Sequence, residues 1–186
     1  MKTKKDTRNS LIEVTSELMN LKGYHGTGMN EILKMSGLPR GSLYHHFPKG
    51  KDELISAALE HAALLKADQF RKAMKGKATA EQGLEAVIDI FINDLTSSDY
   101  TKACPLATVT LDVSGQNAWL TEECAKMYEY WITSVERYLI YKKKNAAREK
   151  AEHFMIAIEG ALLLSKVSRD IRYLMKVKKN IKQVLK

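Results

Sequence analysis

Apolar residues recur at alternating steps of three and four positions along most of the chain, which is the spacing of amphipathic helices. The first stripe predicts a helix over residues 7–22, which Gly23 ends. A second helix, capped by Thr27 and stopped at Gly37, and a third, opened by Pro39 and running to residue 46, are expected next. The first stripe consists of Leu11, Val14, Leu18 and Leu21.

Longer helices are predicted beyond residue 51. Thr79 and Gln82 have the spacing of a capping box, Pro105 can open a short helix, and a turn is expected at residues 142–145. These helices span residues 52–75, 79–95, 105–113, 120–138, 146–166 and 168–184. The expected fold is all-α with about nine helices. A three-helix domain over residues 1–51 should precede a helical domain over residues 52–186.

Composition and charge narrow the class of protein. Only ten of 186 residues are Gly and three are Pro, which disfavours β-sandwiches and barrels. Thirty Lys and Arg against 22 Asp and Glu give a net charge of +8, which suits nucleic acid or an anionic membrane surface as a partner. No apolar run is long enough to cross a membrane, and Ser10 and Glu13 interrupt any signal-peptide core, so we expect a cytoplasmic protein.

The two cysteines, Cys104 and Cys124, have no CxxC spacing and no histidine cluster nearby. A zinc site is therefore not expected, and a disulfide is disfavoured in a reducing compartment. We expect both cysteines to be small buried residues, and we expect neither a metal nor a cofactor.

Two short helices around Gly37 have the layout of a helix-turn-helix, whose second helix enters the DNA major groove. Here that helix has the sequence PRGSLYHH, residues 39–46. Gly41 would cost so short a helix about 1 kcal/mol relative to alanine, which makes sense if the backbone must approach a partner closely. The side chains that can hold this helix against the first are Ile32, Leu33, Leu38, Leu43 and Phe47.

The segment over residues 27–54, TGMNEILKMSGLPRGSLYHHFPKGKDEL, closely resembles the DNA-binding segment of the TetR family of bacterial transcriptional repressors. Its most specific part is GSLYHHF, residues 41–47. Two further features, FPKGK at residues 47–51 and CPL at residues 104–106, are similar to the branch that contains lincomycin-resistance and flavonoid-responsive repressors.

The resemblance implies two sets of DNA contacts. The groove-facing set is Arg40, Gly41, Tyr44 and His45, and the candidates for phosphate contacts are Thr27, Ser42, Lys49 and Lys51. Pro39 departs from the family pattern, which has a Ser or Thr cap at this position. Since Arg40 can bond O6 and N7 of guanine with two hydrogen bonds, we expect a G near the edge of each half-site.

Plainer interpretations of several of these residues stay open. His46 is expected to pack beside Phe47 and is left out of the site. Adjacent helical side chains such as His45 and His46 point about 100° apart, which disfavours a metal site. Lys49 and Lys51 can equally lie in a solvated turn.

The second domain is rich in aromatic and methionine side chains, which line ligand cavities as well as ordinary cores. Tyr100 and Tyr128 belong to this set. Glu129 and Glu159 can balance a cationic effector if they point inward, but surface exposure is expected because acids are seldom buried unpaired. The candidate effector pocket is Phe91, Trp119, Met127, Tyr130, Trp131 and Phe154.

The last two predicted helices carry apolar stripes with small residues that permit close helix approach, and packing within one chain can use some of these residues. The TetR family dimerises through its last two helices, so the resemblance implies a homodimer. The candidate interface is Ile156, Gly160, Ala161, Leu164, Ile171, Leu174 and Met175.

Together with these patterns, the resemblance to the TetR family implies a dimeric repressor that binds a pseudo-palindromic operator in double-stranded DNA. A small apolar or aromatic effector is expected to release it. The alternative is a basic helical protein that binds DNA or a membrane surface without sequence preference. No pairing of a base with a nucleophile supports an enzyme. The sequence names neither the effector nor the operator.

Overall fold

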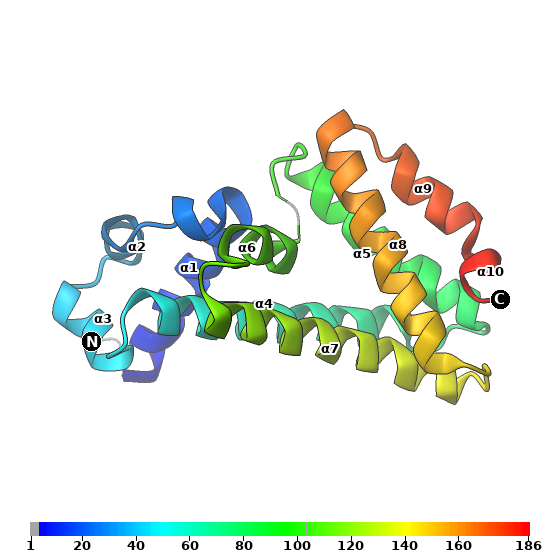
Figure 1. Ribbon diagram of the computed structural model, residues 1–186, viewed down its shortest axis with the longest axis horizontal. Helices are drawn as coiled ribbons and strands as arrows, with labels where there is room; N and C mark the ends of the chain where they lie inside the picture. Colours follow the sequence, from blue (N-terminus) through cyan, green and yellow to red (C-terminus); the bar gives the residue numbers. More distant parts are fainter. Residues whose placement is uncertain (1–3, 103) are drawn as a thin grey trace. The chain divides into compact units, whose positions relative to one another are not determined.

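A computed structural model describes residues 4–102 and 104–186, where every regular element is a helix (Figure 1). The all-α prediction is confirmed. Ten helices occur in these ranges because the last predicted helix divides at Asn180 into α9 (Arg172–Lys179) and α10 (Ile181–Val184). Asparagine competes with helical hydrogen bonding through its own side chain, so it suits such a break.

The helices form two compact units. One consists of Met1–Leu64 and Pro105–Met127, the other of Leu65–Cys104 and Tyr128–Lys186. Two long helices, α4 (Lys51–Met74) and α7 (Ala118–Tyr141), each begin in the first unit and end in the second. Packing thus joins the start of α4 and all of α6 to the first three helices, whereas a functional boundary after residue 51 stays a prediction.

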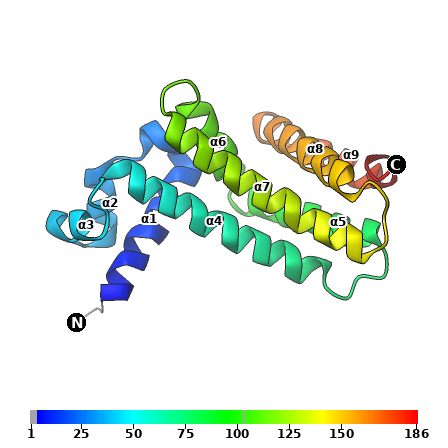
Figure 2. The same cartoon turned by 60° about the horizontal axis from the view of Figure 1, so that its bottom comes forward.

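In the first unit, α1 (Lys4–Gly26) packs against α2 (Met29–Ser36), α3 (Arg40–His46) and α6 (Pro105–Val113) (Figures 1 and 2). The first turns of α4 and α7 lie side by side, and the Ser56 hydroxyl donates to Glu123 Oε2 at 3.3 Å. The buried core of this unit includes Leu11, Met19, Ile32, Leu43, Phe47, Leu54 and Val109.

Two predicted helix starts were wrong. Gly28, not Thr27, is the N-cap of α2, and the buried Thr27 hydroxyl donates instead to the Gly23 carbonyl at 2.6 Å. Pro39 is the N-cap of α3 rather than its first helical residue, because its ψ of 153° is extended. Its carbonyl oxygen accepts the Ser42 N–H at 3.0 Å. A proline needs no donor in either place, so the sequence did not distinguish the two positions.

In the second unit, α5 (Ala80–Ser97) packs against α8 (Ala147–Ser168), α9 and α10. The predicted cap at Thr79 is confirmed, since its hydroxyl accepts the Gln82 N–H at 3.2 Å. The Gln82 side chain in turn accepts the N–H of Ala78, the residue before the cap, at 3.1 Å.

Cys104 and Cys124 are both buried, as expected. Within the part of the chain that the structure describes, no three His, Cys, Asp or Glu side chains gather as metal ligands would. The helices of the same part are all too short or too polar to span a bilayer.

Gly83 of α5 leaves room for the Tyr138 side chain of α7, and this contact generates a stability prediction. A Cβ at Gly83 would overlap the Tyr138 hydroxyl, which donates to the Thr79 carbonyl at 3.0 Å. Gly83→Ala should therefore lower the free energy of unfolding by about 1–3 kcal/mol, because the ring must move. Urea denaturation measures this change.

Tyr138→Phe is the control, since it removes only the partly exposed hydrogen bond and should cost about 1 kcal/mol or less. If Gly83→Ala costs no more than Tyr138→Phe, the close contact between Gly83 and the Tyr138 ring is not a constraint.

Candidate nucleic-acid interface

The turn between α2 and α3 depends on Gly37. This residue has a φ of 68° and a ψ of 23°, a left-handed conformation that glycine adopts without steric cost. Its N–H bonds to the Leu33 carbonyl at 3.0 Å and closes α2. The buried side chains of Leu43 and Phe47 then hold α3 against α1. This arrangement is a helix-turn-helix.

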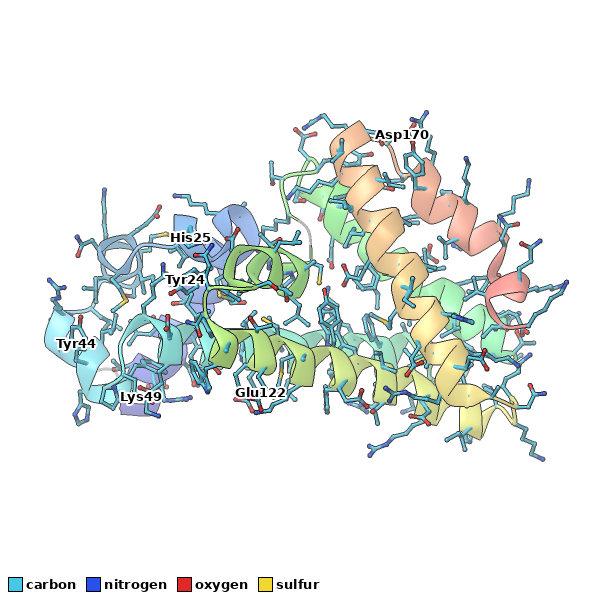
Figure 3. All side chains as sticks on the ribbon, viewed as in Figure 1. Tyr24, His25, Tyr44, Lys49, Glu122 and Asp170 are labelled. Atoms are coloured by element: carbon cyan, nitrogen blue, oxygen red, sulfur yellow. The ribbon has the colours of Figure 1, made fainter. Side chains whose placement is uncertain are left out.

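The four residues of the predicted groove-facing set, Arg40, Gly41, Tyr44 and His45, are all exposed on α3. The Arg40 guanidinium carbon lies 5.9 Å from the centre of the Tyr44 ring, so the two side chains share one surface. Figure 3 labels Tyr44 on this helix and Lys49 in the turn that follows. A Cβ at Gly41 would meet no atom within 4 Å, which leaves the backbone open to a close partner.

The predicted phosphate contacts divide into two pairs. Lys49 is exposed and Ser42 is half-buried, so both remain within reach of DNA. Thr27 is fully buried and its hydroxyl is bonded to Gly23, so its side chain does not reach a phosphate. Lys51 turns inward: its ammonium donates to the Tyr24 carbonyl at 2.7 Å and lies 4.1 Å from the centre of the Tyr24 ring. Burial lowers the pKa of Lys51.

The end of α1 is bound to α6 through Gly23. With a φ of 67° and a ψ of −166°, this residue interrupts the helix and frees the next two N–H groups. Asp112 Oδ2 accepts both, from Tyr24 at 2.8 Å and from His25 at 3.4 Å. A Cβ at Gly23 would overlap the Asp112 carboxylate, so only glycine fits here. Figure 3 labels Tyr24 and His25, on the side of α1 that meets α6.

Tyr24 extends this connection to α4 and α7. Its hydroxyl donates to Asp52 Oδ1 at 2.7 Å, and Asn117 Nδ2 donates to Asp52 Oδ2 at 2.9 Å. Asn117 Oδ1 in turn accepts the Leu120 N–H at 3.1 Å and caps α7. Burial, and then the bond to Asp52, raise the pKa of Tyr24 to about 12. One network therefore joins the ends of α1, α4, α6 and α7.

Sequence reasoning missed the members of this network. Tyr24, Asp52, Asp112 and Asn117 were unassigned because their partners lie 28 to 88 residues away. Periodicity reports which face of a helix is apolar, but it does not report which distant polar group meets that helix. The one local signal was Gly23, which was interpreted only as the end of the helix.

Only some residues of the predicted effector pocket lie together. Phe91, Trp131 and Phe154 are buried in the second unit, and Phe70 lies 5.6 Å from Phe91 and 5.8 Å from Trp131 between ring centres. Phe70 was not predicted, because it falls within the apolar stripe of α4. Trp119 and Tyr130 are 43% and 45% exposed, so they do not belong to this buried cluster. The half-buried Met127 belongs, with Trp119, to the first unit.

Glu129 and Glu159 differ in their exposure and in their hydrogen-bond partners. Glu129 is exposed, as expected, and its carboxylate oxygens accept bonds from Arg148 Nη1 and Nη2 at 2.5 and 2.7 Å, which lowers its pKa. For Glu159 the expected surface position is wrong. Its Oε1 is buried without a hydrogen-bond partner, and burial raises its pKa.

The outer face of α8 carries exposed apolar residues at helical spacing. Ala161 and Leu174 do not belong to it, because both pack inside the protomer, and Ile171 is half-buried. Leu163 and Val167, which were not predicted, are exposed. The exposed apolar residues of α8 and α9, together with the exposed Gly160, are thus Ile156, Gly160, Leu163, Leu164, Val167 and Met175.

Two family models match the chain. One describes the C-terminal domain of LmrA/YxaF-like transcriptional regulators and matches residues 80–180, more than half of the chain. The other describes bacterial regulatory proteins of the tetR family and matches residues 11–58. The chain belongs to the TetR family. It is a helix-turn-helix DNA-binding transcriptional regulator of the LmrA/YxaF-like branch, which confirms the resemblance carried by GSLYHHF.

Relatives of this TetR-family regulator extend over its whole length. The transcriptional regulator LmrA of Bacillus subtilis is 27% identical over 183 residues, which cover 97% of each chain. The reduced form of Escherichia coli NemR has the same fold, with a TM-score of 0.84, 21% identity and coverage of 97% and 98% of the two chains. The regulator CifR, solved with 26-bp operator DNA, has a TM-score of 0.80, 16% identity and coverage of 96% and 95%.

The network at Gly23 generates a prediction. Asp112→Ala removes the acceptor of two N–H groups and should lower the free energy of unfolding by about 1–3 kcal/mol. Hydrogen exchange at the Tyr24 and His25 amides should accelerate. Asp112→Asn keeps an acceptor oxygen and should lower the free energy of unfolding by less than Asp112→Ala does.

Asp89→Ala is the matched control, because it removes an aspartate from an exposed ion pair with Lys178 and should cost less than about 1 kcal/mol. Unchanged exchange at both amides in Asp112→Ala would show that the bond does not hold α1 to α6.

Proposed function

We propose that this TetR-family regulator is a dimeric repressor of a pseudo-palindromic operator and that a small apolar or aromatic effector releases it. The observation that carries the proposal is the exposed surface of α3 that Arg40, Gly41 and Tyr44 share. In a helix-turn-helix the first residues of the second helix meet base edges, so Arg40 is the residue that bonds guanine. The operator complex of CifR, which has the same fold, supports DNA as the partner.

The other proposed DNA contacts are inferred from the exposure of each side chain. His45 completes the groove-facing surface, and Lys49 and Ser42 contact phosphates on either side of it. Thr27 and Lys51 hold the domain together instead. The excess of eight positive charges strengthens binding to any duplex, so base contacts are needed for specificity.

Dimerisation uses the exposed apolar face of α8 together with Met175 of α9. Two recognition helices on a two-fold axis contact a palindrome, whereas one helix contacts too few base pairs for specificity. Gly160 supports this interface, because nothing within 4 Å of it fills the space beside α8 in the protomer.

Release requires an effector that prefers the conformer with poorly spaced recognition helices. A change from nearly full to nearly empty operator needs a preference of about 10⁴-fold. The aromatic cluster around Phe70 and Trp131 is our candidate contact for the effector body. The network of Asp112, Tyr24 and Asp52 then carries any shift of α4 or α6 to α1.

Selection of bound sequences from a random duplex pool tests the proposal. The protein should enrich a palindrome with a G near the edge of each half-site. Arg40→Ala should cost about 1–3 kcal/mol per half-site and relax one base position. Lys49→Ala should weaken binding to all sequences alike and reduce the salt slope by roughly 0.9 for each phosphate that the lysine no longer neutralises.

Lys72→Ala is the control, because Lys72 is an exposed lysine of the second unit that pairs with Asp68 within α4. It should leave both the motif and the salt slope unchanged. A pool that yields no motif would favour the alternative, a basic protein that binds DNA without sequence preference.

The dimer is tested with Leu164→Glu. A carboxylate on the exposed apolar face of α8 should give a folded monomer, because an unpaired charge is costly to bury. Light scattering measures the mass, and circular dichroism verifies the fold. Leu111→Glu, on an exposed position of α6, should remain a dimer. A dimer mass for Leu164→Glu would place the interface elsewhere.

A further inference from the structure

A small polar cluster lies among the apolar side chains of the second unit. Tyr128 of α7 and Cys104, which precedes α6, bring their Oη and Sγ atoms to 3.8 Å. The carboxylate of Glu159, on α8, accepts side-chain hydrogen bonds from both. Three separate segments of the chain therefore converge on one acid.

One oxygen of this acid has no donor. Glu159 Oε1 is buried and accepts no hydrogen bond from the part of the chain that the structure describes. The other such atoms, on Asn20, Thr110 and Ser165, belong to neutral groups. Glu159 is thus the one acid in this set, and the residue as a whole is half-buried.

The charge of Glu159 is also without a counter-ion. Other acids of the same unit have cations beside them: Glu129 pairs with Arg148, Glu81 with Lys144 and Asp94 with Lys66. No ion pair of Glu159 occurs among the described residues. Burial therefore raises the pKa of its carboxyl group, and an adjacent cation would restore the ionised form.

Aromatic rings border the cluster. The Tyr128 ring meets Trp131 edge-on at 5.9 Å between centres, and Trp131 meets Phe70 at 5.8 Å. Ring faces attract cations as well as flat apolar groups. A ligand that bonds Glu159 Oε1 would thus extend its apolar body along these rings.

We propose that Glu159 is the anchor of the effector site and that it binds the protonated amine of an aromatic or apolar ligand. The ammonium donates to Oε1, while Tyr128 and Cys104 hold the other side of the carboxylate. This inference rests on the proposed function, and it specifies the ligand class: a lipophilic cation rather than a neutral or anionic aromatic compound.

The test uses two matched probes of the same shape. 1-Naphthylmethylamine is a cation at neutral pH, and 1-naphthylmethanol is neutral. The full-length protein should bind the amine more tightly, measured by tryptophan fluorescence, because Trp131 lies beside Tyr128. Glu159→Gln keeps the shape of the side chain and should weaken amine binding about 30-fold. Binding of the alcohol should change less than about twofold.

Glu129→Gln is the matched control. It removes another glutamate charge from the same unit, but one that is exposed and already paired with Arg148. It should change amine affinity less than about twofold. Tyr128→Phe, which keeps the ring contact with Trp131, should weaken amine binding by a smaller factor than Glu159→Gln.

Two results overturn the proposal. The first is that the wild-type protein binds the amine no more tightly than the alcohol, or binds neither compound. This comparison uses the wild-type protein alone, so it does not depend on whether a variant folds. The other is equal loss of amine affinity in Glu129→Gln and Glu159→Gln.

Operator release is measured separately. If the alcohol releases the operator and the amine does not, the proposed function survives while the ligand class fails. If the amine binds through Glu159 without affecting the operator complex, the site survives while effector-controlled repression fails.

Discussion

The bond between Asp112 and the freed N–H groups after Gly23 is the contact on which the DNA-binding unit depends. It exists because Gly23 takes a φ of 67° that interrupts α1 and turns two donors toward α6. Backbone donors that leave the helical pattern need other acceptors, and Asp112 supplies one carboxylate oxygen for both. The position of α3, and hence of Arg40, follows from how α1 is held.

The same contact gives the DNA-binding unit a means of responding to a shift of α4 or α6. α6 is connected to α1 by Asp112, and α4 is connected to α1 by Asp52 through the Tyr24 hydroxyl. Hydrogen bonds to charged groups are stronger than neutral ones and geometrically exacting, so a small shift of either helix changes what α1 can bond. A two-state response needs such a discrete set of contacts rather than a continuously deformable one.

Positive charge serves two different purposes in this chain. Arg40 and Lys49 are exposed and suit DNA, whereas Lys51 stabilises the carboxyl end of α1 by bonding its Tyr24 carbonyl. A net charge of +8 therefore describes affinity for polyanions only roughly. Each lysine must be assigned by its own partners.

The sequence by itself determined the all-α class, most helix boundaries, the Thr79 cap and the helix-turn-helix with its exposed Arg40, Gly41, Tyr44 and His45. These features are local: they depend on periodicity, on capping residues and on a motif within about thirty residues. Only the tertiary structure decided that Thr27 and Lys51 face inward, and that Trp119 and Tyr130 face solvent. It also decided that one carboxylate oxygen of Glu159 is buried, whereas Glu129 is exposed. Each of these depends on which distant segment packs against the residue, and a stripe of apolar positions specifies a buried face without specifying its partner.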